Sequence, residues 1–468
     1  MDQGGTDEFP LLTDESEPTA PADQAARLAD EDVQLDLFGM PVAGASANNG
    51  ASGAVPGNGG DRANALINAD ARIPTVAHAT SAIAHATAPT NRSRQPRTQS
   101  IASLWQDEAE TEGALSSDPH EAERTPSPPA APKQRRAREV AAAEPSPEVL
   151  AIAQALPPQV HLGTSSWSFP GWNGIVYADD YSNSKLSRDG LAAYGAHPLL
   201  RTVSIDRSFY APLTVTDYLR YAQQVPDHFR FIVKAPAMVT DATVRAERGE
   251  PVSLNPCFLN AQLAIDEFVR PCLDGLGAKA GALVFQFSPL PDQMLADPAG
   301  FIERLALFLA ALPPLLDGAC YAVEIRDACL LTPRFIRTLK AAGVRYCVGI
   351  HARMPDPLRQ AAALALLDGE PAGPLIVRWS LHGGFKYEQA KAKYEPFDRL
   401  VDEDPTTRMA LAELAARYAI AGQPVVIAVN NKAEGSAPLT CAKLGQAIVE
   451  AYARLMEESE SADAAAPT

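Results

Sequence analysis

Acidic and histidine side chains recur at the ends of short apolar runs in the second two thirds of this sequence. Asp206 follows one such run, Glu324 lies at the end of another, and His382 comes shortly after a third. Carboxylate and imidazole groups can act as general acids and bases, and they can also bind a divalent metal ion. We therefore take Asp206, Glu324 and His382 as candidate catalytic residues, with a divalent metal as a cofactor that they could hold together with His351.

Cationic, hydroxyl, amide and aromatic residues occupy the same kind of position. Cations neutralise phosphate groups, hydroxyl and amide groups hydrogen-bond to a ligand, and indole rings stack on nucleic-acid bases. The pattern predicts a site for nucleic acid or for a phosphorylated small molecule. Its candidate ligand-binding residues are Thr164, Ser165, Trp167, Trp172, Arg207, Lys234, Gln286, Arg326, Arg378, Asn430 and Asn431.

Each of these residues, taken alone, also has a simpler structural explanation. Glu324 and Arg326 could form an ion pair at the rim of the domain, and His382-Gly383-Gly384 could be a turn. A polar or ionisable residue after every apolar run is harder to explain in this way, because the ends of parallel strands in a barrel converge in space. That convergence, rather than any single residue, is the argument for a site.

The apolar runs alternate with helical patterns eight times along the chain. They are continuous and rich in β-branched residues, as expected of parallel strands that are buried on both faces. Eight strand–helix units in about 300 residues predict an α/β fold of the (β/α)8, or TIM-barrel, type. A doubly wound open sheet is the alternative, but no glycine-rich phosphate loop follows the first strand. The expected strands are 160–162, 201–206, 229–234, 282–286, 321–325, 344–348, 375–379 and 425–429.

Composition separates the first third of the chain from the rest. Residues 1–150 hold three aromatic residues, and 11 Lys and Arg against 23 Asp and Glu, so most of the net charge of −17 lies there. Such a segment buries too little apolar surface to offset the entropy lost on ordering. The sequence predicts a disordered, low-complexity acidic tail over 1–155, a barrel over 158–456 and a disordered C-terminal tail over 457–468.

The sequence shows no pattern for export or for membrane insertion. The first twenty residues are acidic and lack an apolar core segment, and the longest apolar stretch is broken by Pro313-Pro314. The six cysteines lack CxxC spacing, which favours reduced and mostly buried thiols. We expect a cytoplasmic protein without a membrane partner. Its acidity argues against broad nonspecific binding of nucleic acid, but not against a local basic groove.

Several of these units contain distinctive motifs. They are Gly163-Thr164-Ser165-Ser166-Trp167-Ser168-Phe169-Pro170-Gly171-Trp172, residues 203–210, 231–235, 283–287 and 323–326, Arg378 with His382-Gly383, and 429–431. These motifs resemble those of the YecE-like family, known as domain of unknown function 72. The resemblance covers nearly all of 160–450 in the correct order, and it implies a TIM-type barrel without an established activity.

The chain departs from the family pattern at several positions that could belong to the site. The family usually has a glycine where this chain has Ser166, and a Glu–Ile–Asn run where it has Ser204-Ile205-Asp206. It usually has histidines at the positions of Asp241 and Asp327. This member could therefore have altered or lost an ancestral activity.

One segment of the acidic tail is unlike its surroundings. Gln34-Leu35-Asp36-Leu37-Phe38 resembles the pentapeptide by which many bacterial replication and repair proteins bind the DNA polymerase sliding clamp. In that motif the Gln hydrogen-bonds at the rim of a groove while the Leu and Phe side chains fill apolar pockets. The simpler alternative is a local hydrophobic cluster or a transient helix. The resemblance assigns partner binding to Gln34, Leu35, Leu37 and Phe38.

Three functions fit these observations. The first is a phosphodiesterase or nuclease that the tail tethers to the sliding clamp, with Glu324, Asp206 and His382 in catalysis. The second is a glycosidase-like enzyme acting on a small metabolite through the carboxylates of Glu324 and Asp206. Gln286, at the end of the fourth strand, counts against that second function because it is not a carboxylate. The third is a non-catalytic scaffold that binds phosphate or nucleic acid.

Overall fold

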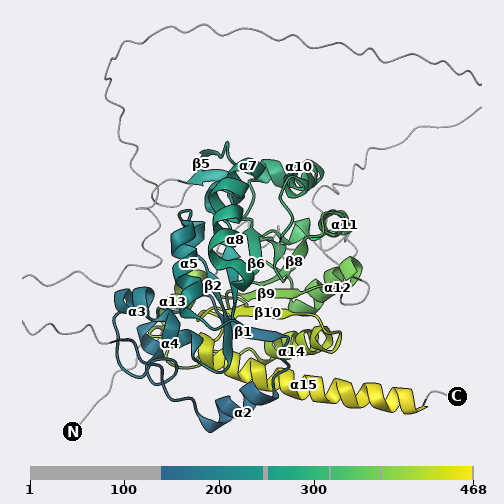
Figure 1. Cartoon of the computed structure of the whole chain (residues 1–468). Coiled ribbons are helices and arrows are strands. Elements are labelled where there is room, and N and C mark those ends of the chain that lie inside the picture. Colours follow the sequence, from purple (N-terminus) through teal and green to yellow (C-terminus); the bar gives the residue numbers. More distant parts are fainter. Residues whose placement is uncertain (1–138, 246–250, 316–317, 369–371, 466–468) are drawn as a thin grey trace, which may run out of the picture. The chain divides into compact units, whose positions relative to one another are not determined.

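The computed structural model describes residues 139–245, 251–315, 318–368 and 372–465. In this part of the chain, parallel strands close into a barrel and helices surround it (Figure 1). The (β/α)8 fold predicted from the sequence is confirmed.

Eight strands form the barrel in the order β1-β10-β9-β8-β7-β6-β3-β2, and every neighbouring pair is parallel. The first and last strands meet in register, so that Val160 pairs with Val425 and Thr164 with Val429. The strands are β1 Val160–Thr164, β2 Leu200–Ile205, β3 Arg230–Lys234, β6 Ala280–Gln286, β7 Cys320–Glu324, β8 Arg345–Ile350, β9 Leu375–Trp379 and β10 Val425–Val429. A two-stranded antiparallel sheet of β4 Thr243–Arg245 and β5 Pro251–Leu254 lies in the connection after β3.

Small and branched apolar side chains fill the inside of the barrel. They are Ile232, Ala282, Val284, Ala322, Cys347, Ile376, Val426 and Ala428. Successive side chains of a strand point to opposite faces, so the residue two positions after an inward-facing one also faces inward. These positions, at the carboxyl ends of the strands, are occupied by polar residues: Lys234, Gln286, Glu324, Arg378 and Asn430.

Helices return the chain between the strands, and several begin at a side-chain cap. Thr214 caps the helix that begins at Val215: it accepts a hydrogen bond from the Asp217 backbone and closes a capping box. The described helices are α2 Pro147–Ala155, α3 Asn183–Asp189, α4 Leu191–Gly195, α5 Val215–Gln224, α6 Ala237–Thr240, α7 Ala261–Ala264, α8 Arg270–Leu276, α9 Asp292–Leu295, α10 Pro298–Ala310, α11 Pro333–Ala341, α12 Pro357–Asp368, α13 Tyr387–Tyr394, α14 Pro405–Ile420 and α15 Ala437–Ala465, with a π-helical stretch, Ile265–Val269, between α7 and α8.

The ends of the folded part differ from the predicted boundaries at 155 and 456. Helix α2 lies inside the range expected for the tail, and α15 runs past residue 456 to Ala465. Ile152 of α2 packs against Gly445 of α15, where a Cβ atom would lie 2.9 Å from the isoleucine Cγ2. Helix α2 therefore belongs with the barrel. Residues 1–138 of the predicted tail, with the motif at 34–38, lie outside the described residues.

Two further features bear on the environment predicted for the chain. Within the described ranges, no helix is long and apolar enough to cross a membrane. All six cysteines are free; three are buried and three partly buried. Burial raises the pKa of the Cys272 and Cys347 thiols, so they are inert core groups.

Candidate functional site

The polar side chains at the carboxyl ends of the strands form a charged cluster, which we call the mouth cluster. At its centre is Glu324, the last residue of β7, whose side chain is fully buried. One carboxylate oxygen, Oε1, lies 2.7 Å from Nη2 of Arg326, and Oε2 accepts a hydrogen bond of 2.7 Å from Nη1 of Arg378. The mouth cluster consists of Asp206, Lys234, Gln286, Glu324, Arg326 and Arg378.

Arg378 of β9 joins three strands of the barrel. Its Nη1 donates to Glu324 of β7, while its Nη2 donates to both carboxylate oxygens of Asp206, at 3.0 and 2.8 Å. Asp206 follows β2 directly and also accepts a bond of 2.6 Å from the Ser204 hydroxyl. The two candidate catalytic carboxylates thus share one guanidinium.

A glycine on β8 makes room for the buried carboxylate. A Cβ atom at Gly349 would lie 3.1 Å from Oε1 and 3.3 Å from Cγ of Glu324. That spacing is tighter than ordinary van der Waals contact, so a larger residue would push Glu324 away from its two arginines. Gly349 is a part of the site that the sequence analysis missed.

The arginines keep Glu324 ionised. Burial alone would raise the pKa of its carboxyl, but the charges of Arg326 and Arg378 outweigh burial and lower it. Burial likewise disfavours the charge of Arg378, but Asp206 and Glu324 outweigh this and raise its pKa. For Arg326 burial dominates and lowers the pKa. The result is a buried, fully charged network.

Lys234, at the end of β3, is the cation of the cluster that lacks an ion-pair partner. Its Nζ lies 3.4 Å from the centroid of the Phe209 ring, and no carboxylate of the described residues is within ion-pair distance of it. Burial is the largest influence on this amine. The charges of Arg378 and Arg326 lower the pKa of Lys234 further, whereas those of Asp206 and Glu324 raise it. The net result is a pKa of about 8.

Two donors of the arginines also lack acceptors. Nη2 of Arg326 is engaged by Glu324 and, at 3.4 Å, by Oε1 of Gln286, but its Nη1 is buried without a partner among the described residues. Nε of Arg378 is likewise buried without a hydrogen-bond partner among the described residues. Buried polar groups of native proteins almost always have partners, so these donors need an acceptor from a ligand or from water.

Three of the predicted ligand-binding residues are instead bonded inside the protein. Thr164 is buried, and its Oγ1 donates to the Ser166 carbonyl oxygen and lies 2.9 Å from the Tyr194 hydroxyl. Trp172 is 0 % exposed, and its indole nitrogen donates to Oδ1 of Asn431 at 3.2 Å. The bond between Trp172 and Asn431 holds the loops after β1 and β10 together. Thr164, Trp172 and Asn431 are all buried, so they present almost no surface to a ligand.

The other predicted residues form hydrogen bonds or ring contacts with partners outside the mouth cluster. Ser165 accepts a bond of 2.7 Å from Nδ2 of Asn430. Trp167 is buried edge-on against Tyr221, whose hydroxyl accepts a bond of 3.3 Å from the exposed Arg207. His382 contacts its own loop, since its Nδ1 lies 2.7 Å from the Gly383 carbonyl oxygen. His382 is therefore not brought to the two carboxylates, and the turn explanation fits it.

The metal site considered for Asp206, Glu324, His351 and His382 does not form. In the described part of the chain, no three His, Cys, Asp or Glu side chains come together in a way that could hold a metal ion. Both oxygens of Glu324 face guanidiniums, and Nδ1 of His351 accepts a bond from the backbone of Arg353. Burial, with Arg326 nearby, lowers the pKa of His351 to about 4, so the imidazole is neutral at neutral pH.

Two of the positions that depart from the family pattern have clear structural roles. Asp206 holds Arg378. Asp327 accepts a hydrogen bond of 2.8 Å from the backbone of Leu290 and pairs with Arg353 at 2.8 Å. Asp327 therefore ties together the loops that follow β6, β7 and β8.

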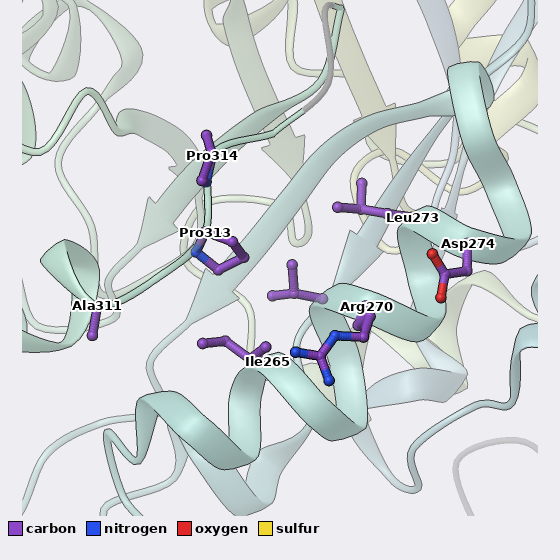
Figure 2. A pocket seen from close by; sticks show the side chains of 8 residues that line it. Ile265, Arg270, Leu273, Asp274, Ala311, Pro313 and Pro314 are labelled. Carbon is purple, nitrogen blue, oxygen red and sulfur yellow. The ribbon is translucent and has the colours of Figure 1, made fainter.

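A hollow of about 300 Å³ lies elsewhere on the domain (Figure 2). It is lined by the π-helical stretch, α8 and the segment after α10, and most of its side chains are apolar. Arg270 at its edge is already paired with Asp266 at 2.9 Å. No group of chemically active side chains converges there, so the mouth cluster remains the candidate site.

The parallel barrel with a charged cluster at the carboxyl ends of its strands defines a TIM-barrel protein. The chain belongs to the family described as protein of unknown function DUF72, whose model matches residues 161–465. A solved DUF72 family protein from Enterococcus faecalis has 16% identity and a TM-score of 0.43, over 62% of this chain and 95% of that one. One from Thermotoga maritima has 18% identity and a TM-score of 0.40, over 64% and 99%. No relative among functionally curated proteins matches.

Proposed function

We propose that the mouth cluster binds a phosphate-bearing small molecule. The observation that carries the proposal is a buried cationic cluster with unfilled donors. Nη1 of Arg326 is buried without an acceptor among the described residues. Nζ of Lys234 lies 3.4 Å from the Phe209 ring centroid and has no ion-pair partner in the described part of the chain. Phosphate oxygens are strong acceptors for such donors.

Charge supports an anionic ligand. Three cationic side chains, Lys234, Arg326 and Arg378, face the carboxylates of Asp206 and Glu324, which leaves one positive charge when every group is ionised. Leaving a buried charged donor unsatisfied costs more than about 1–3 kcal/mol. A bound oxyanion would supply both the missing acceptor and the missing negative charge.

The depth of the donors favours a small ligand over a nucleic-acid strand. Arg326 is 8% exposed, and the Trp172 ring, considered for base stacking, is buried. A strand that crosses the surface relies on exposed cations and exposed aromatic faces. Of the cations predicted to neutralise phosphate, Arg207 alone is exposed.

A phosphodiesterase or a glycosidase receives less support from the same geometry. A general acid needs a carboxyl with a raised pKa, whereas the two arginines lower the pKa of Glu324. Oε2 of Glu324 accepts a hydrogen bond from Arg378, and Oε1 lies 2.7 Å from Arg326 without a hydrogen bond among the described residues. The side chain is fully buried. Glu324 is better suited to holding the arginines in position than to proton transfer.

Replacing Lys234 by alanine should weaken the binding of inorganic phosphate by about tenfold to a hundredfold. This is the loss of affinity expected when one hydrogen bond to a charged group is removed. Isothermal titration of the full chain measures this. Lys340→Ala is the matched control. Lys340 is exposed in the last turn of α11, which leads the chain back from the carboxyl end of β7 to the opposite end of the barrel. Equal phosphate affinity in wild type and Lys234→Ala would contradict the proposal. Tighter binding of a single-stranded oligonucleotide than of phosphate, also lost in Lys234→Ala, would favour nucleic acid.

We also propose that the tail docks on the DNA polymerase sliding clamp, on the strength of Gln34-Leu35-Asp36-Leu37-Phe38 alone. A peptide of residues 33–40 should bind the clamp with a dissociation constant on the order of micromolar, as short docking peptides with few anchors do. Leu37→Ala with Phe38→Ala should abolish binding because the apolar anchors are gone. Fluorescence anisotropy measures both peptides, and unchanged binding of the double variant would refute the proposal.

A further inference from the structure

Lys234 is held firmly at the end of β3. Its carbonyl oxygen accepts a hydrogen bond of 2.6 Å from the Ser208 hydroxyl, which ties the strand end to the loop after β2. Its side chain lies across the Phe209 ring from that same loop. Lys234 as a whole residue is partly exposed at the mouth of the barrel, although its amine is largely desolvated.

The charged groups around Lys234 come from the carboxyl ends of three other strands of the barrel. Asp206 follows β2, Glu324 and Arg326 lie at the end of β7, and Arg378 belongs to β9. The carboxylates favour the ammonium form, but both are already paired with guanidiniums. With a pKa of about 8, about one amine in ten is neutral at pH 7 and half at pH 8. Desolvation beside other cations is a recognised way of activating a lysine as a nucleophile.

We propose that Lys234 is a nucleophilic amine that forms an imine with an aldehyde or ketone carrying a phosphate group. This inference rests on the proposed function, since the phosphate group would be held by the unfilled donor of Arg326. The proposal adds a substrate class, phosphorylated carbonyl compounds, and a chemical role for the one cation of the mouth cluster that has no carboxylate partner in the described residues.

The reaction needs no further reagent. The lone pair of the neutral amine attacks the carbonyl carbon, so a C–N bond forms, the C=O π bond breaks, and one amine proton moves to the oxygen through solvent. The resulting carbinolamine loses its hydroxyl group and the second amine proton as water, which leaves the C=N bond. One amine and one carbonyl give one imine and one water.

Two other lysines of the described part, Lys279 and Lys443, are in different surroundings. Nζ of Lys279 donates to the carbonyl oxygens of Ala222 and Val225, and Lys443 is paired with Glu403. Acceptors and carboxylates stabilise the ammonium form, which is not nucleophilic. Selective modification of Lys234 is therefore a demanding test.

Pyridoxal 5′-phosphate serves as the probe, because it is a phosphorylated aldehyde. The full chain is incubated with it, the imine is reduced to a stable amine with borohydride, and peptide mass spectrometry locates the adduct. We expect occupancy at Lys234 at least tenfold above that at any other lysine, rising between pH 7 and pH 8, and reduced by excess inorganic phosphate. Lys234→Arg should lose this adduct, and Lys340→Arg should keep it.

Phosphate affinity measured on the same samples separates the two proposals. The wild-type chain carries this comparison, because Lys234→Arg alters a residue of the phosphate site itself. If phosphate binds but the adducts spread over exposed lysines without preference for Lys234, the imine inference is wrong and phosphate binding stands. If phosphate does not bind, the proposed function fails. Labelling of Lys234 by pyridoxal as efficient as by its phosphate would overturn the phosphate requirement.

Discussion

Replacing Glu324 by glutamine should lower the free energy of unfolding by about 3–5 kcal/mol, the usual effect of removing one partner from a buried ion pair. The amide has nearly the shape of the carboxylate, so no cavity complicates the result. Its neutral group would leave Arg326 and Arg378 without the charge that now lies 2.7 Å from each of them. Chemical denaturation at pH 7 measures the loss.

Glu303→Gln is the matched control for this variant. Glu303 is paired with Arg334 at the same distance, 2.7 Å, but its side chain is 70% exposed. Water screens such a pair, so the control should lose no more than about 1 kcal/mol. Similar losses in the two variants would mean that burial does not give the mouth cluster its importance for stability.

The effect of Glu324→Gln should also depend on pH. The folded protein holds the pKa of Glu324 below its ordinary value, so the carboxylate stabilises the fold fully above the unfolded pKa of about 4.3. This contribution is lost as pH falls through the lower, folded pKa. The difference in stability between wild type and variant should therefore shrink in acid. A difference that grows toward low pH would contradict the assigned direction.

Replacing Trp172 by alanine should lower the free energy of unfolding by about 3–5 kcal/mol, the range for truncating a large buried aromatic residue. The ring lies 4.9 Å from that of Phe169 and 6.4 Å from that of Tyr194, centroid to centroid. Its indole nitrogen also donates to Asn431, in the loop after β10. Thermal and chemical unfolding of the purified variant measure the loss.

Trp172→Phe separates packing from hydrogen bonding. It keeps an aromatic ring beside Phe169 and Tyr194 but leaves Oδ1 of Asn431 with one donor, the backbone of Ala437. We expect a loss smaller than that of the alanine variant by about 1 kcal/mol or more. If alanine and phenylalanine were equally harmless, Trp172 would not be a core residue, and its assignment as a ligand-stacking surface would have to be reconsidered.

Strand positions were predictable because β-branched runs buried on both faces have a distinct composition. The members of the mouth cluster were predictable for a related reason: the carboxyl ends of parallel strands meet, so Asp206, Glu324 and Arg378 had to be neighbours wherever the barrel closed. The simple ion-pair explanation for Glu324 with Arg326 also proved correct, although the pair is buried rather than at an exposed rim.

The depth of each side chain was not predictable. Trp172 lies in the loop after a polar strand end, where an exposed ligand-binding residue would also be expected. It is buried instead, and its indole nitrogen donates to Asn431, 259 positions later, in the loop after β10. Thr164 is hidden by Tyr194 in the same way. Gly349 carries no chemical signal, because what matters there is the side chain that it leaves room for. Such effects depend on long-range packing, which composition and spacing do not encode.

Arg378 also constrains how the chain can fold during synthesis. Its partner Asp206 precedes it by 172 positions, and Asn430 reaches back to Ser165 across 265. The ribosome must therefore deliver β9 before Asp206 and Glu324 meet their common guanidinium, and β10 before β1 gains its second neighbour. Until then the growing sheet has open edges, which are prone to pairing with other chains. The barrel can therefore close its sheet edges against aggregation only once β10 has emerged from the ribosome.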